Sequence, residues 1–287
     1  MNLLSPNDIK ALLNKYGTEP SKGLGQNFLI DKLVLDKIIE SADIKPSDTI
    51  LEVGPGIGTL TQALAEKAEK VIAIEKDKTM CEILKETMKA AQQGEPRQGR
   101  DYKNVEIIHS DILKLNPKPY TLYPYKIVAN IPYYLTSPLI RKLLEAENPP
   151  REIVLMLQKE VAQRICAKPP RMSLLAVSVQ FYADAKIISY VSKNCFWPSP
   201  KVDSAIIKIV PRPDASLRAK RSNLFFKIVK AGFSQPRKQL AGNLSKILKL
   251  DREKTTAWLL KSKINPTQRS ETLSISDWQN LTKTAHI

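Results

Sequence analysis

Short apolar runs alternate with amphipathic stretches from residue 49 to about residue 160. The amphipathic stretches repeat apolar residues three and four positions apart, which predicts helices. The apolar runs predict buried strands near 50–53, 71–74, 105–108, 127–129 and 153–157. Because strands and helices alternate, we expect a mostly parallel sheet with helices on both faces.

The N-terminal region predicts two helices before the first strand. Ser5-Pro6 is typical of a helix start and Gly17 of a helix end, and a second helix begins at Asp31. Beyond residue 160, helices are expected at 161–165 and 174–179, followed by an antiparallel pair of strands at 185–192 and 201–210.

The remainder of the chain predicts only helices, at about 216–231, 236–249, 251–262 and 276–285. Pro236 and Asp251 are the expected starts of two of them. We therefore predict a first domain over residues 1–212, with an N-terminal arm at 1–30, and a small all-helical domain over residues 213–287.

Charge is unevenly distributed along the 287 residues. The formal net charge is +16, and residues 211–287 hold 16 Lys and Arg against 5 Asp and Glu. A phosphate backbone is the natural partner of such a surface, although a basic face without any partner would have the same composition. An anionic membrane is a weaker alternative, because no lipid anchor or strongly apolar face accompanies the charge.

Composition also bears on compartment and metal binding. The chain contains no apolar run long enough for a membrane helix and no signal-peptide pattern, so we expect a cytoplasmic protein. Its three cysteines, Cys81, Cys166 and Cys195, are widely spaced, which argues against both a disulfide framework and a zinc site. We expect no metal.

Three glycines follow the first strand at alternate positions, Gly54, Gly56 and Gly58. Dinucleotide-binding folds have G-x-G-x-x-G at this turn, whereas G-x-G-x-G is the form found in S-adenosylmethionine-dependent methyltransferases. Glycines here let the backbone approach a ligand closely. The alternative is a glycine-rich turn that binds nothing.

Two further strands end in acidic residues. Glu75 follows the second strand, 21 positions after Gly54, where a carboxylate can accept hydrogen bonds from both ribose hydroxyls. Asp111 follows the third strand and could accept from an adenine amine, while Ile112 could cover the ring. Each acid alone is more often a solvated loop residue, but three strand ends in order make chance much less plausible.

The fourth strand ends in Asn130-Ile131-Pro132-Tyr133. The 6-amino group of adenine is a poor nucleophile, because its lone pair is delocalised into the ring. The Asn130 side-chain oxygen and a backbone carbonyl, that of Ile131, could hold this nitrogen in line with a methyl sulfonium. Tyr133 could stack on a base that has left its stack, and Phe196 could cover the other face. Core packing is the alternative for both rings.

These motifs together resemble the ribosomal RNA adenine dimethyltransferases, of the kasugamycin-sensitivity type that acts on the small subunit. The resemblance spans roughly residues 20–245 and rests on Gly23-Leu-Gly-Gln-Asn-Phe-Leu29, Leu51-Glu-Val-Gly-Pro-Gly-Ile-Gly58, Asn130-Ile-Pro-Tyr133, Phe196-Trp-Pro-Ser-Pro-Lys-Val-Asp-Ser204 and Phe233-Ser-Gln-Pro-Arg-Lys238. It implies a Rossmann-like methyltransferase sheet followed by a basic helical domain that binds RNA.

The resemblance also implies an activity. Members transfer two methyl groups from S-adenosylmethionine to each of two adjacent adenosines in the 3′-terminal hairpin loop of small-subunit rRNA, with S-adenosylhomocysteine as the product. The substrate is an immature small ribosomal subunit, and we expect a monomer. By motif match, the residues expected to line the cofactor site are Asn27, Leu29, Gly54, Gly56, Glu75, Asp111, Ile112 and Asn130.

Two segments depart from the family pattern. The stretch 92–103 is longer than the usual connection, and 168–173 lacks the usual Ser-Lys-Tyr-like stretch. Three other functions stay open: an antibiotic-resistance methylase acting on large-subunit rRNA, a non-catalytic RNA-binding factor with the same fold, and a DNA adenine methylase. The Gly23-Leu-Gly25 sequence at the start of the first motif favours the small-subunit type over the large-subunit methylase. The presence of Asn130 and Tyr133 argues against a non-catalytic factor.

Overall fold

The computed structural model describes residues 1–89, 102–115, 124–215, 218 and 222–285, so most of the predicted loop at 92–103 lies outside the described residues. The chain divides into two compact units. The first comprises Met1–Leu143, Pro150–Ala162 and Lys186–Val210, and the second Leu144–Pro149, Gln163–Ala185 and Pro211–Ile287. The last segment begins close to the predicted boundary at residue 212, but two earlier segments that we assigned to the first domain also group with the second unit.

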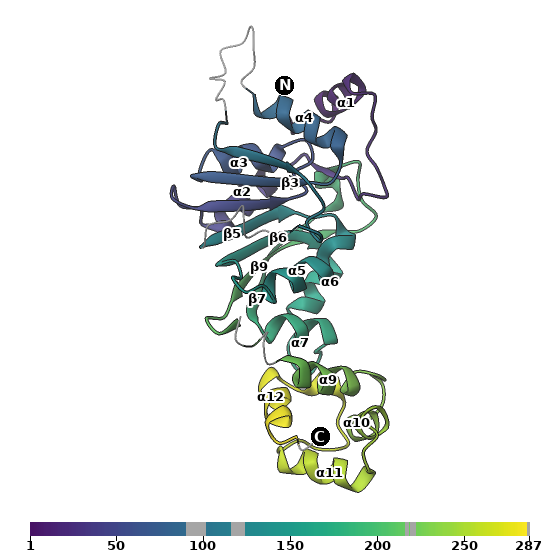
Figure 1. The fold of residues 1–287 in the computed structure, drawn as a ribbon. Helices are drawn as coiled ribbons and strands as arrows, with labels where there is room; N and C mark the ends of the chain where they lie inside the picture. Colours follow the sequence, from purple (N-terminus) through teal and green to yellow (C-terminus); the bar gives the residue numbers. More distant parts are fainter. Residues whose placement is uncertain (90–101, 116–123, 216–217, 219–221, 286–287) are drawn as a thin grey trace. The chain divides into compact units, whose positions relative to one another are not determined.

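The main sheet has seven strands in the order β4-β3-β2-β5-β6-β9-β7 (Figure 1). The first five are parallel and confirm the five predicted strands, whereas β9 runs antiparallel to β6. Their bounds are β2 Thr49–Val53, β3 Lys70–Glu75, β4 Val105–His109, β5 Tyr125–Asn130, β6 Glu152–Gln158, β7 Ala183–Val191 and β9 Ser204–Pro211.

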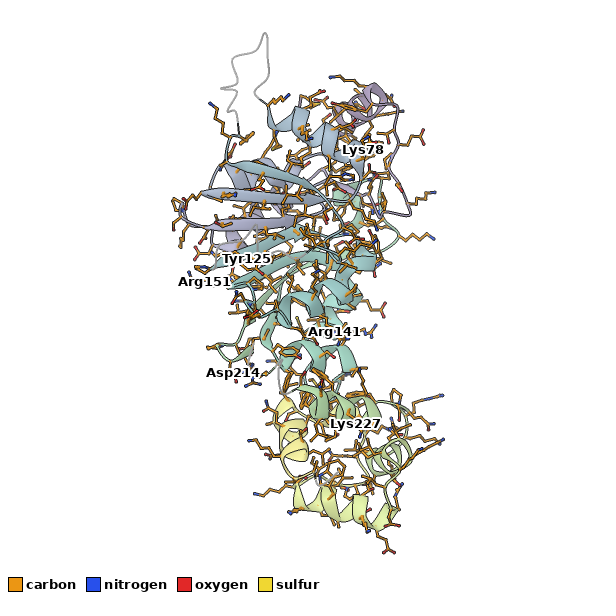
Figure 2. All side chains as sticks on the ribbon, in the orientation of Figure 1. Lys78, Tyr125, Arg141, Arg151, Asp214 and Lys227 are labelled. Carbon is orange, nitrogen blue, oxygen red and sulfur yellow. The ribbon has the colours of Figure 1, made fainter. Side chains whose placement is uncertain are left out.

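The direction of strand addition reverses beside β2. The chain proceeds from β2 to β3 and β4 on one side, then returns to place β5 and β6 on the other. Tyr125 and Arg151, labelled in Figure 2, lie at the amino ends of β5 and β6, where the Arg151 N–H donates to the Tyr125 carbonyl at 2.8 Å. Open α/β sheets bind ligands at the opposite, carboxyl ends of such a reversal.

Among the described residues, six α-helices begin in the first unit; the starts predicted at Ser5 and Asp31 are confirmed, whereas the helix predicted from residue 161 begins at Lys159. Ser5, Asp31 and Asp77 accept backbone N–H groups as N-caps of α1, α2 and α4. Apolar residues of α2 and α3 pack against Ile50, Val128 and Val154 of the sheet. The bounds are α1 Pro6–Lys15, α2 Lys32–Ala42, α3 Thr59–Ala65, α4 Lys78–Met88, α5 Thr136–Leu144 and α6 Lys159–Ile165.

A buried lysine joins α2 to the sheet. The Lys126 side chain on β5 donates to the carbonyls of Ala42 and Asp43, at 3.0 and 2.7 Å, and pairs with Asp48 at 2.8 Å. All three ammonium protons therefore have acceptors, which offsets the desolvation of a charge that is only 5% exposed.

The sequence did not predict one strand pair. β1 (Phe28–Leu29) and β8 (Phe196–Trp197) form a small antiparallel sheet, with Leu29 opposite Phe196. The Phe196–Trp197 segment, which lies between the two strands predicted at 185–192 and 201–210, therefore pairs with the N-terminal arm. A short 3₁₀ helix, η2 (Lys193–Cys195), precedes β8.

In the residues that the structure describes, the regular structure of the second unit is helical apart from the start of β7 and the last residue of β9. Its core includes Trp278, whose ring lies beside that of Phe233, and a separate cluster of the Phe181, Tyr182 and Phe225 rings against which the half-buried Phe226 packs. Its helices are α7 Leu174–Gln180, α9 Ser222–Gly232, α10 Leu240–Leu248, α11 Arg252–Lys261, η3 Ser270–Thr272 and α12 Ile275–Lys283 (Figure 1).

One predicted helix start in this unit is wrong. Asp251 caps α11 as expected, but α10 begins at Leu240 rather than at Pro236. The Asn243 amide donates to the carbonyls of Gly232 and Gln235, at 2.7 and 2.9 Å, and so holds the preceding segment as a turn. No helix in the described part of the chain has the length and apolar character needed to cross a bilayer.

Candidate active site at the carboxyl edge of the sheet

A cavity lies where β2, β3, β4 and β5 end, and the N-terminal arm and β8 complete its wall. It brings together residues from six separate segments of the sequence. All ten predicted site residues line it: Asn27, Leu29, Gly54, Gly56, Glu75, Asp111, Ile112, Asn130, Tyr133 and Phe196.

The glycine turn after β2 is required by packing. Gly54, Gly56 and Gly58 have φ of 68°, 57° and 96°, a region that favours glycine. A Cβ on Gly54 would lie 3.2 Å from the Pro132 ring, and one on Gly58 would lie 2.7 Å from Met88. The turn can therefore approach the Asn130–Tyr133 segment and α4 only without side chains.

Glu75 is held rigidly at the end of β3. Its carboxylate accepts from the N–H groups of Gly56, Lys76 and Asp77, at 3.1, 2.8 and 2.9 Å, and its side chain faces the cavity. Burial raises the pKa of Glu75 despite these hydrogen bonds. A carboxylate has about four acceptor positions, so one remains for a ligand hydroxyl.

Asp111 has a charged neighbour that the sequence analysis did not anticipate. One carboxylate oxygen accepts from the Leu113 N–H at 2.9 Å, and the other lies 3.1 Å from the Lys76 ammonium. The Leu113 hydrogen bond, assisted by Lys76, lowers the pKa of Asp111. Ile112 is 4% exposed and gives this part of the cavity an apolar wall.

Tyr133 is fixed by a partner from β9. Its hydroxyl lies 2.9 Å from the hydroxyl of Ser204, which is fully buried. Burial raises the pKa of Tyr133, so the phenol is protonated near neutral pH. Tyr133 also starts a 3₁₀ turn, η1 (Tyr133–Leu135), in which Leu135 N–H donates to the Pro132 carbonyl at 3.0 Å. Asn130 is partly exposed at the end of β5.

The N-terminal arm closes one side of the cavity. The Gln26 side chain donates to Asp77 at 3.0 Å, and the Asn27 amide nitrogen donates to the Gly25 carbonyl at 3.1 Å. This orientation leaves the Asn27 side-chain oxygen as a possible acceptor. Leu29 is 4% exposed and Phe196, its partner in the small sheet, is also 4% exposed. Phe196 therefore belongs to the core as well as to the cavity wall.

Sequence reasoning missed Glu52, Lys76 and Tyr134, which also line the cavity. Glu52 is 1% exposed, and its Oε2 atom has no hydrogen-bond partner among the described residues. Burial, with the nearby charge of Glu75, raises the pKa of Glu52 to about 8. The available signal was an acidic residue two positions before the first glycine of the turn.

The family profile for ribosomal RNA adenine dimethylases matches residues 18–286. The chain belongs to the ribosomal RNA adenine dimethylase family. Two relatives in this family are named ribosomal RNA small subunit methyltransferase A. The protein from Alkaliphilus metalliredigens is 40% identical, over 98% of this chain and 97% of its own length. The protein from Dehalococcoides mccartyi strain 195 is 42% identical, over 95% of this chain and 90% of its own.

Solved structures agree with this membership in the dimethylase family. A dimethyladenosine transferase from Plasmodium falciparum has a TM-score of 0.73 and 29% identity, over 88% of this chain and 95% of that one. The 23S rRNA methyltransferase ErmE has a TM-score of 0.70 and 26% identity, over 90% and 99%. The predicted Rossmann-like methyltransferase sheet with a helical C-terminal part is confirmed.

Proposed function

We propose that this adenine dimethyltransferase uses S-adenosylmethionine to dimethylate the 6-amino groups of two adjacent adenosines in the 3′-terminal hairpin loop of small-subunit rRNA. It acts as a monomer on immature small subunits in the cytoplasm. One observation carries the proposal: a single cavity is lined both by two acidic residues suited to bind a nucleoside, Glu75 and Asp111, and by the Asn130–Tyr133 segment. The small-subunit relatives at 40% and 42% identity support the choice of RNA.

The cavity fits S-adenosylmethionine at three places. Glu75 has one acceptor position left for a ribose hydroxyl, and Ile112 offers an apolar surface beside an adenine ring. The buried Oε2 of Glu52 lacks a partner, and a ligand ammonium would satisfy it. When bound, the cofactor supplies a methyl group on a sulfonium.

Asn130 has the central role in the proposed chemistry. Its side-chain oxygen accepts a hydrogen bond from the adenine amine, and the Ile131 carbonyl accepts the second. These two acceptors draw the nitrogen lone pair out of the ring and aim it at the reacting carbon. The nitrogen loses its proton after the new bond forms, so no strong base is needed.

The Tyr133 ring stacks on one face of the target base. The ring is oriented by the hydrogen bond to Ser204, so it offers a fixed face to a base that has left the RNA stack. A stacked base contributes about 1–3 kcal/mol, which offsets part of the energy of flipping. Phe196 is more deeply buried, and we assign it the role of closing the cavity wall.

The second unit contains a strongly basic cavity that fits an RNA backbone. Its lining includes five cationic side chains and no acidic one: Arg237, Lys238, Lys246, Arg252 and Arg269. The turn that carries Arg237 and Lys238 is fixed by the buried Asn243. Cations on a rigid scaffold bind phosphates with little loss of conformational entropy.

The test is the methylation state of rRNA in cells. A strain lacking this protein should yield small-subunit rRNA without dimethyladenosine, as measured by mass spectrometry. The wild-type gene should restore four methyl groups, and Asn130→Ala should restore none while its protein still binds RNA. Because ErmE is structurally similar, large-subunit rRNA should be measured in the same samples. If the wild-type gene restored methyl groups only in large-subunit rRNA, the assignment to the small subunit would be refuted.

A further inference from the structure

An exposed aromatic ring lies with a lysine at the edge of the sheet that carries the cavity. Tyr190, one residue before the end of β7, is 53% exposed. The ammonium of Lys159, the first residue of α6, lies 5.3 Å from the centre of the Tyr190 ring. This distance permits a cation–π interaction. Exposure of one ring is ordinary by itself, so what matters is its pairing with Lys159 and where the pair lies.

A short series of contacts connects this pair to the cavity. Tyr133 contacts Ser204, as described above, and the neighbouring Asp203 holds Lys159 in two ways. The Asp203 carbonyl accepts from the Lys159 N–H at 3.0 Å, and its carboxylate lies 3.6 Å from the Lys159 ammonium. Lys159, and with it the Tyr190 ring, therefore lies close to the side of the cavity that Tyr133 lines.

The local charge is mixed rather than simply basic. Lys193 and Lys201 lie on the exposed surface near Asp203, and Lys193 donates its backbone N–H to the Asp203 carboxylate at 3.2 Å. Glu160, next to Lys159, is also exposed. Because charges of both signs are present, the ring is the feature here that favours a base, as aromatic rings do in proteins that bind single-stranded nucleic acid.

We infer that Tyr190 and Lys159 form a nucleotide subsite that binds the residue next to the target adenosine. The inference rests on the proposed function. When the target base flips into the cavity, its neighbour loses one stacking partner. The Tyr190 ring replaces that partner, and the Lys159 ammonium contacts the adjoining phosphate. RNA recognition commonly combines a stacked base with a cation in this way.

The test compares two substitutions of the ring on the full-length protein. Tyr190→Ala removes the ring, whereas Tyr190→Phe keeps it and removes only the hydroxyl. Methylation of immature small subunits, prepared from cells lacking this protein, gives kcat and KM for each variant. Tyr190→Ala should raise KM for the subunit about five- to tenfold, consistent with the loss of one stacked base. Tyr190→Phe should remain within about twofold of wild type.

A second measurement probes the lysine. Lys159→Gln should raise KM about threefold and weaken its dependence on salt. Lys37→Gln is the matched control, because Lys37 is also exposed and pairs with an acid at 3.5 Å, but on α2. It should change neither quantity. The affinity for S-adenosylmethionine should stay unchanged in every variant, which shows that the fold is intact.

The outcomes separate this inference from the proposed function. If wild-type protein methylates small subunits but Tyr190→Ala has an unchanged KM, the subsite does not exist. If Tyr190→Phe loses as much as Tyr190→Ala, the hydroxyl matters and stacking is refuted. If wild-type protein methylates no small subunit, the proposed function itself fails and the subsite fails with it.

Discussion

Glu52 offers a sharp test of the site, because one substitution should change stability and cofactor affinity in opposite directions. The residue lies on β2, two positions before Gly54, and is 1% exposed. Burial raises its pKa from 4.5 to about 8. Glu52→Gln keeps the shape of the side chain but replaces the titratable carboxyl group with an amide that is neutral at every pH used.

The expected stability change follows from proton uptake. Between pH 4.5 and about pH 8, folding protonates Glu52, because the folded form has the higher pKa. The stability of wild-type protein therefore falls as pH rises through this window. One pKa unit corresponds to about 1.36 kcal/mol, which gives an upper bound of about 3 kcal/mol at pH 7 and about 5 kcal/mol above pH 8. Local relaxation reduces this, so we expect Glu52→Gln to gain about 1–3 kcal/mol at pH 7.

Whereas Glu52→Gln should make the protein more stable, it should lower the affinity for the cofactor. If the carboxylate pairs with the ammonium of S-adenosylmethionine, Glu52→Gln should weaken binding at least tenfold, or about 1.4 kcal/mol. Calorimetry in buffers of different ionisation enthalpy should detect a proton released by wild-type protein at pH 7, and none by the variant.

The assay is denaturant unfolding at pH 5, 7 and 9, without the cofactor, together with calorimetric titration. Glu69→Gln is the control, because Glu69 is an exposed glutamate at the surface. The reasoning is refuted if the stability difference between Glu52→Gln and wild type does not grow with pH. An unchanged affinity for the cofactor would remove Glu52 from the binding site.

Three further predictions concern other contacts. Ser204→Ala and Tyr133→Phe should each lower kcat/KM about fivefold, and the double variant should be no worse than either, because both remove one hydrogen bond worth about 1 kcal/mol. Lys126→Met should lower the free energy of unfolding by about 3 kcal/mol in urea titrations, since it removes the buried ammonium's hydrogen bonds to two carbonyls and its ion pair with the half-buried Asp48. Arg237→Gln and Lys238→Gln should each weaken rRNA binding and reduce its salt slope by about one, without changing cofactor affinity.

The results that would contradict these predictions are specific. Additive losses in the double variant would mean that the two hydroxyls act independently. An unchanged urea midpoint for Lys126→Met would show that the buried ion pair contributes nothing net. A salt slope equal to that of wild type would place Arg237 and Lys238 outside the RNA contact.

The parallel sheet could be predicted because its signals are local. Each buried strand is a short apolar run, and the carboxyl ends of parallel strands meet at one edge. Residues such as Gly54, Glu75 and Asp111 could therefore be placed together before any coordinates were known. Helix starts at Asp31 and Asp251 were equally local, because an N-cap bonds residues only two or three positions ahead.

Long-range partners could not be predicted in the same way. Nothing near Leu29 indicates that Phe196 will lie opposite it, and two residues are too few for a detectable strand period. The Ser204 hydroxyl beside Tyr133 is a similar case. The start of α10 was misplaced because a tertiary hydrogen bond from Asn243 favours a turn where Pro236 suggested a helix.

Helix α1 lies outside the residues that the family profile matches, but its packing helps to fix one wall of the cavity. The profile match begins at residue 18, after α1 has ended. Apolar residues of α1 pack against Ile57 of the glycine turn, and the Tyr16 hydroxyl donates to Glu86 on α4 at 2.7 Å. That hydrogen bond is the main cause that raises the pKa of Tyr16 to about 12, so it persists at any physiological pH.

A second contact ties the arm to the other end of α4. Gln26 donates to Asp77, the N-cap of this helix, so the arm between residues 17 and 25 is attached at both ends. A loop with fixed ends has fewer conformations to lose when a ligand binds against it. Because Gly25, Asn27 and Leu29 line the cavity directly, α1 preorganises one wall of the site although no residue of α1 is among those that line it.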